Sequence, residues 1–148
     1  MEQDKNNVFF FRFEDLRIYN KALDYVGLVH GYTKSFPENE RHALSAKFMH
    51  AAESIAINIA EGSGRNKTQF IYYLKMAKSS IRECIVITTI AQRLKFISES
   101  SIEESRQQLI EMTKMVGALI ASLQRTAKGP ELVEEDDDDE MSFNKFTS

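Results

Sequence analysis

The sequence predicts an all-α protein: an up-and-down antiparallel four-helix bundle over residues 13–127. A short apolar N-terminal arm (1–12) is expected to precede it, and a disordered acidic C-terminal tail (128–148) to follow it. Few breakers interrupt the chain, since it has two prolines and six glycines, and this favours long elements over a many-turned β fold. Apolar residues recur every three or four positions through four segments, as they do along one side of a helix. The connections between these segments are short, so neighbouring helices should be antiparallel.

The first helix is expected over residues 13–35, and Phe36-Pro37 should stop it because the residue before proline is pushed out of the α region. It has two apolar faces, one formed by Leu16, Tyr19, Leu23 and Val26 and the other by Ile18, Ala22, Tyr25, Val29 and Tyr32.

The second helix is expected over residues 38–61, with Gly62 and Gly64 providing its C-terminal break. Its apolar positions are Leu44, Phe48, Ala51, Ile55 and Ile59.

The third helix should start at Asn66, because Asn66 and Gln69 have the spacing of a capping box. The run from Ile85 to Ile90 is rich in β-branched residues and would, alone, indicate a strand. The periodic segment around it is too long for a strand and holds no turn signal, so we expect a helix. Its seam consists of Phe70, Leu74, Ala77, Ile81, Cys84, Thr88 and Ala91.

The fourth helix should begin near Ser98 or Ser101 and end at Gly129-Pro130. Its seam is formed by Ile102, Leu109, Met112, Val116, Leu119 and Leu123.

Charge divides the chain into two parts. Residues 1–128 contain 18 basic and 14 acidic residues, whereas residues 129–148 contain one lysine and eight acids. The start of the chain lacks the pattern of a signal peptide, and no apolar run reaches the roughly 20 residues of a membrane span. The single cysteine excludes an internal disulfide. We therefore expect a soluble, cytoplasmic protein with a mildly basic body and an acidic tail.

The apolar faces are wider than a monomeric bundle needs. One stripe of about 100° suffices for a helix that covers a single core. The first helix has two stripes, and the third is apolar on nearly every side around Cys84–Ile87. Such surplus indicates a subunit interface, so we expect a homo-oligomer; the alternative is a helix that is central to the bundle.

The sequence shows no pattern of catalytic or metal-binding residues. His30, His42 and His50 have no i,i+4 partner, and no Glu-x-x-His occurs, so no metal site and no cofactor are expected. Cys84 lies in an apolar seam, which favours a packing role. The acidic tail could hold divalent cations loosely, although a solvated tail is the simpler interpretation. We expect the protein not to be an enzyme.

Four polar residues in or near apolar stretches are predicted to form a structural network: Asn58, Glu61, Arg65 and Glu83. Such a network would fix the turn between the second and third helices. The alternative is a binding or catalytic carboxylate.

Basic residues accumulate on the third helix, where Glu83 is the one acid between residues 67 and 95. Lys75, Lys78 and Arg82 have the spacing i, i+3 and i+7 of one helix face, which can follow a line of phosphates. The alternative is the solvated side of a buried helix. The predicted nucleic-acid-binding residues are Lys67, Lys75, Lys78, Arg82 and Arg93.

Three segments resemble one bacterial family. They are residues 13–22, residues 35–40 and, most distinctively, residues 51–65, Ala-Ala-Glu-Ser-Ile-Ala-Ile-Asn-Ile-Ala-Glu-Gly-Ser-Gly-Arg. The chain is similar over residues 13–125 to the four-helix bundle proteins encoded within 23S rRNA intervening sequences, often called S23 ribosomal proteins. The resemblance implies a homopentamer. It also implies kinship with the accessory variability protein of diversity-generating retroelements, which binds nucleic acid and a reverse transcriptase.

Two features depart from the family pattern. Met49-His50 stands where an arginine pair is common, and the acidic tail is additional. We expect a homo-oligomeric scaffold that binds RNA, DNA or a nucleic-acid enzyme, with its tail masking the basic face. The alternative is an interaction protein with a protein partner and no nucleic-acid binding.

Overall fold

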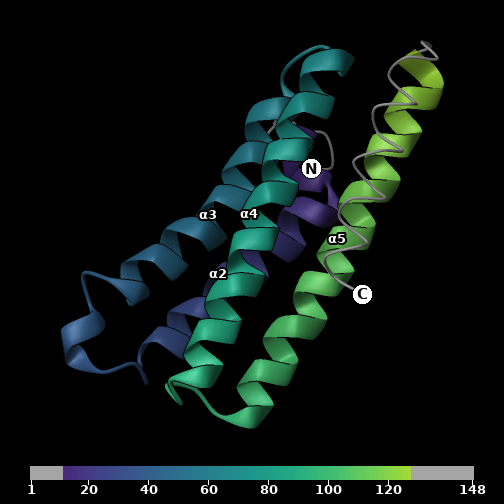
Figure 1. Cartoon of the computed structure of the whole chain (residues 1–148). Helices are drawn as coiled ribbons and strands as arrows, with labels where there is room; N and C mark the ends of the chain where they lie inside the picture. Colours follow the sequence, from purple (N-terminus) through teal and green to yellow (C-terminus); the bar gives the residue numbers. More distant parts are fainter. Residues whose placement is uncertain (1–11, 128–148) are drawn as a thin grey trace, which may run out of the picture.

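Four long helices run through residues 12–127, the part of the chain that the computed structural model describes (Figure 1). They are α2 (Arg17–Thr33), α3 (Leu44–Ser63), α4 (Lys67–Arg93) and α5 (Glu99–Ala127). Two short 3₁₀ helices, η1 (Arg12–Asp15) and η2 (Glu38–Glu40), precede α2 and α3. The predicted arm and tail, and the predicted stop at Gly129-Pro130, lie outside the described residues apart from Arg12.

Each helix packs against two neighbours, in the order α2, α3, α4, α5 and back to α2. The backbones of the diagonal pairs, α2 with α4 and α3 with α5, stay apart within residues 12–127, and these helices approach each other only through side chains in the core. The predicted up-and-down four-helix bundle is therefore confirmed. No helix in the described part of the chain is long and apolar enough to cross a lipid bilayer.

The starts of α4 and α5 follow the predicted capping signals, whereas α2 begins at Arg17 and α3 at Leu44, later than the expected residues 13 and 38 and without a side-chain cap. Asn66 caps α4, since its Oδ1 accepts a hydrogen bond from the Gln69 backbone N–H at 2.9 Å. The Ser98 hydroxyl accepts from the Ser101 backbone N–H at 3.2 Å, so the earlier of the two predicted starts of α5 is the one used. The β-branched run from Ile85 to Ile90 is helical, as its surroundings predicted.

The end of α3 differs from the prediction. Gly62 lies inside the helix, which continues to Ser63, with Gly64 as its C-cap. A Cβ added at Gly62 would lie 2.6 Å from the Tyr73 Cβ on α4, closer than two such atoms approach. Gly62 therefore allows α3 and α4 to come together, and does not end the helix as expected.

The core fills the space between the inner faces of all four helices, with Tyr25, Phe48, Ile55 and Ile81 among its fully buried side chains. The predicted seams of the second and third helices are buried for the most part, as is the face of the first helix that contains Tyr25, whereas its other predicted face, from Leu16 to Val26, is half-buried or exposed. In the second half of α5 the buried positions are Val116, Ile120 and Gln124, while Leu119 and Leu123 are half-buried.

The connection after α4 ends the helix without glycine. Lys95 has a left-handed backbone with φ of 59°. The Phe96 N–H donates to the Ala91 carbonyl at 2.9 Å and the Lys95 N–H to the Gln92 carbonyl at 3.0 Å, which is the Schellman pattern. The Ser35 hydroxyl donates to the Phe96 carbonyl at 2.9 Å, so this connection is tied to the one between α2 and α3.

Candidate functional site

The outward face of α4 carries a stripe of exposed residues. Tyr72 and Val86 are 57% and 53% exposed although they are large and apolar. Successive positions alternate in steps of four and three, which keeps them on one side of the helix. We call this set the outer stripe; it consists of Tyr72, Met76, Ser79, Glu83, Val86 and Ile90.

The predicted nucleic-acid-binding residues lie along α4 beside the outer stripe. Lys67 and Arg93 are exposed at the two ends, and Lys75 and Arg82 are half-buried. Lys78 is 5% exposed, because it shares its edge of the helix with Ile71 and Ile85, seven residues before and after it. We call the five residues the basic edge. Its middle is less accessible than the spacing alone predicted.

The predicted polar network is divided into separate contacts. Glu61 forms an ion pair with Arg65, whose guanidinium lies over the Tyr73 ring at 5.1 Å from its centroid. The Asn58 amide instead donates to the Ser54 carbonyl and hydroxyl on its own helix.

A serine pair supplies the link between α3 and α4 that was expected of Glu83. The Ser80 hydroxyl donates to the Ser54 hydroxyl at 2.8 Å. Glu83 is exposed, and within residues 12–127 no hydrogen bond joins it to Asn58, Glu61 or Arg65. Glu83 therefore lies apart from the other three residues of the predicted network, because its position on α4 belongs to the outward face.

A buried polar cluster that the sequence reasoning missed joins α2, α4 and α5. The Thr88 hydroxyl donates to the Cys84 carbonyl at 2.8 Å, so its oxygen accepts from Ser105 at 2.9 Å. The Ser105 oxygen in turn accepts from the Tyr25 hydroxyl at 2.8 Å. Each hydroxyl has a single proton, and this order uses all three of them. Ser105 lies at seam spacing between Ile102 and Leu109, which is the signal that could have found it.

Burial raises the pKa of three side chains in and near this cluster. Desolvation raises the pKa of the Tyr25 hydroxyl and of the Cys84 thiol far above their ordinary values. Desolvation also raises the pKa of Tyr32, and so does the hydrogen bond that its hydroxyl donates to Glu104 at 2.8 Å. All three groups are therefore neutral near pH 7 and serve packing and hydrogen bonding.

The α2–α5 interface also contains an ion pair between Lys21 and Glu111. The hydrogen bond from Lys21 lowers the pKa of Glu111.

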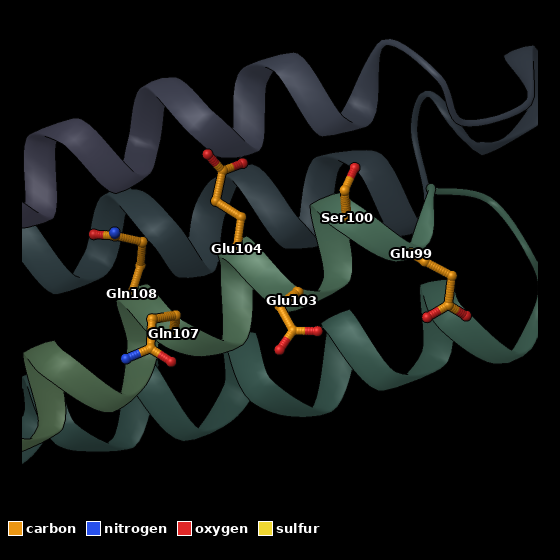
Figure 2. A pocket seen from close by; sticks show the side chains of 6 residues that line it. All are labelled: Glu99, Ser100, Glu103, Glu104, Gln107 and Gln108. Atoms are coloured by element: carbon orange, nitrogen blue, oxygen red, sulfur yellow. The ribbon is translucent and has the colours of Figure 1, made fainter.

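A hollow of about 560 Å³ lies along the first half of α5. Its lining residues all come from that helix, and Figure 2 shows Glu103 and Glu104 pointing in opposite directions from it. Glu104 is the acceptor for Tyr32. The carboxylates therefore do not converge on one point, and within the described part of the chain no group of three or more His, Cys, Asp or Glu side chains is placed to hold a metal ion.

Comparison with known proteins identifies one family. The family model described as 23S rRNA-intervening sequence protein matches residues 14–118. A crystal structure of a protein of unknown function from the S23 ribosomal protein family of Bacteroides thetaiotaomicron superposes with a TM-score of 0.64 at 21% identity, covering 70% of this chain and 95% of that one. At this identity the superposition shows a shared fold. A search among curated proteins finds no match.

Proposed function

The chain belongs to the family of 23S rRNA-intervening sequence proteins, and from this premise we propose that it is a non-enzymatic, homo-oligomeric scaffold that binds nucleic acid or a nucleic-acid-processing partner such as a reverse transcriptase. The site that would serve this function is the surface of α4. The basic edge would contact the polyanion, and the exposed apolar residues would join the subunits.

The observation that carries the nucleic-acid part of the proposal is the charge of α4 and its C-terminal end. Six cations and one acid lie between residues 67 and 95. From Lys67 to Arg93 the helix rises by about 39 Å, long enough to follow several phosphates. Lys67 and Arg93 are exposed, and Lys75 and Arg82 reach the surface in part. Lys78 would add to the local field from its buried position.

The outer stripe supports the oligomeric part. Large apolar residues on one helix face that no other helix within residues 12–127 covers are typical of a subunit interface. Ile57 on α3 is a further exposed apolar residue, with 62% of its surface exposed. The family resemblance implies five subunits.

A titration tests nucleic-acid binding. Fluorescence anisotropy of a labelled single-stranded RNA should show affinity that falls with salt, with a log–log slope of about 0.7 for each phosphate neutralised. Lys75→Glu with Arg82→Glu should weaken binding at least tenfold. The matched control is Lys34→Glu with Lys47→Glu, which changes net charge equally at exposed positions away from the basic edge. If the two double variants weakened RNA binding equally, the basic edge would act only through the net charge of the protein and not as a specific contact surface.

The second candidate function is a protein–protein scaffold without nucleic-acid binding. The exposed apolar residues of α4 favour it, because an apolar stripe can seat a protein partner as well as another subunit. Wild-type protein that leaves RNA anisotropy unchanged at low salt would select this function, since electrostatic binding is strongest there.

A further inference from the structure

The apolar and polar positions of the outer stripe are arranged symmetrically about the level of Ile81. Tyr72 and Ile90 each lie nine residues from Ile81, Met76 and Val86 lie five residues from it, and Ser79 and Glu83 lie two residues from it. Reversal of the helix therefore places apolar positions on apolar positions and polar positions on polar positions. A surface with this property is complementary to itself.

We propose that two copies of the chain pair through the outer stripe, α4 against α4 in antiparallel orientation, about a two-fold axis that lies at the level of Ile81 along α4 but on the outward side of the helix. Tyr72 then meets Ile90 of the partner subunit, and Met76 meets Val86 of the partner subunit. Ser79 meets Glu83 of the partner subunit. Such an isologous contact closes after two copies. The inference rests on the oligomeric part of the proposed function and names one surface of contact between copies, whereas the closure of a ring of five chains would need a second, different surface.

The spacing of residues in the outer stripe suits pairing with the α4 helix of a second copy. Steps of four and three along a helix are those by which side chains of two paired helices interlock. The same stripe is exposed along α4, with Tyr72, Val86 and Ile90 uncovered by other helices of the same chain. A partner helix lying along α4 would cover all of these positions at once.

The polar pair in the middle fixes the register. The Ser79 hydroxyl can donate to the carboxylate of Glu83 of the partner subunit, and the symmetry creates this bond twice. A shift of the partner by seven residues would place Glu83 against Val86 or Tyr72 of the partner subunit. A carboxylate covered by an apolar side chain loses its hydration without gaining a donor, so the shifted pairings are disfavoured.

The pairing brings the two basic edges together. Lys75 and Arg82 directly precede Met76 and Glu83, so they follow one edge of the stripe. A two-fold axis normal to the plane of two antiparallel helices keeps each edge on its own side. The pair therefore presents both basic edges on the same side, and a bound polyanion would reduce the repulsion between them. A ring of five chains, which the family resemblance implies, would join a second ring through this contact.

Crosslinking tests the orientation. The double variant Tyr72→Cys with Ile90→Cys is treated with a bismaleimide of about 8 Å span and separated on a denaturing gel. Within one chain these positions are about 27 Å apart along the helix, so the linker cannot join them. Antiparallel pairing predicts a product of twice the 17.0 kDa chain. Each single variant is the control and should stay monomeric, because its two introduced cysteines lie at opposite ends of the pair and the native Cys84 is buried. Crosslinking of either single variant, or of none of the three, would overturn the proposal.

A charge exchange tests the contact independently. Val86→Glu should halve the particle mass in light scattering, and addition of Met76→Lys should restore it, because residue 76 faces residue 86 of the partner subunit. Both positions are exposed, so circular dichroism should show the same helix content for all three proteins. Unchanged mass for Val86→Glu, or absence of rescue by Met76→Lys, would contradict the pairing. The RNA titration is a separate measurement, so pairing without RNA binding would reject the nucleic-acid function alone.

Discussion

The inner and outer faces of α4 are made of similar residues on one helix but have different surroundings. Leu74 and Ile81 face inward and are completely buried, whereas Val86 and Tyr72 face outward and are more than half exposed. Both faces repeat at helical spacing, so the periodicity that identifies an apolar face does not tell which molecule covers it. The inner face is covered by the other helices of the same chain, whereas no other helix within residues 12–127 covers the outer face, where we propose that a second copy of the chain binds.

Polar residues on the two faces also differ. Thr88 on the inner face has its hydroxyl in a continuous chain of buried hydrogen bonds. Glu83 on the outer face lies in water. A polar group on the inner face therefore contributes through defined partners, while one on the outer face contributes only when a second molecule arrives.

The largest expected effect comes from truncation on the inner face. Ile81→Ala removes fully buried atoms and should lower the free energy of unfolding by about 2–5 kcal/mol. Val86→Ala should cost under about 0.5 kcal/mol in dilute solution. Urea unfolding at several protein concentrations measures both, and only the loss at Val86 should grow with concentration. Equal losses at the two positions would remove the distinction between the faces.

A smaller effect is expected at the buried tyrosines, and it should depend on pH. The folded state raises the pKa of Tyr25 and Tyr32 above the unfolded value of about 10. Above that pH the folded chain holds more protons than the unfolded one, so stability is complete below pH 10 and falls as pH rises further.

A variant that lacks one buried hydroxyl shows how much of the alkaline loss of stability comes from tyrosine titration and how much from general alkaline denaturation. Tyr25→Phe should cost about 0.5–1.5 kcal/mol at pH 7, because Ser105 keeps its bond to Thr88, and it should flatten the alkaline loss. Thermal unfolding between pH 7 and pH 11 measures this. Tyr72→Phe on the outer face is the control. An alkaline profile of Tyr25→Phe that matches wild type would show that Tyr25 does not carry the pH dependence.

The smallest effect is expected at Glu83. A buried, hydrogen-bonded carboxylate there would make Glu83→Ala cost about 1–3 kcal/mol. The structure places Glu83 on the exposed face, so the expected loss in a single chain is under about 0.5 kcal/mol. Chemical unfolding of Glu83→Ala and Glu83→Gln should give the same midpoint. If Glu83→Ala, but not Glu83→Gln, lowered the free energy of unfolding by several kcal/mol, Glu83 would have to belong to a structural hydrogen-bond network.

The elements were predictable because their signals are local. Asn66 caps its own helix, and the seam through Ile81 repeats within one segment. The role of Gly62 was not predictable, because it depends on where Tyr73 lies on a different helix. The seam of α5 was placed by a seven-residue repeat, but a straight helix drifts by about 20° per repeat. By the second half of α5 the buried positions have therefore moved to Ile120 and Gln124.

The candidate site was predictable in composition and less so in exposure. The charges of the basic edge follow directly from the sequence. The burial of Lys78 follows from its position between Ile71 and Ile85, which pairwise spacing with Lys75 and Arg82 did not show. The pairing of Asn58 with Ser54 was missed because short polar side chains have several partners within one helix turn, and the sequence does not choose among them.

Cys84 is a native probe of how often the bundle opens. It is the single thiol of the chain, it is fully buried in α4, and burial raises its pKa. Alkylating reagents react with the exposed thiolate, so modification proceeds only through the small population in which α4 has separated from its neighbours. The rate of Cys84 modification therefore measures the frequency of this opening without any introduced label. Comparing this rate with and without a second molecule bound to α4 would show whether binding slows the opening.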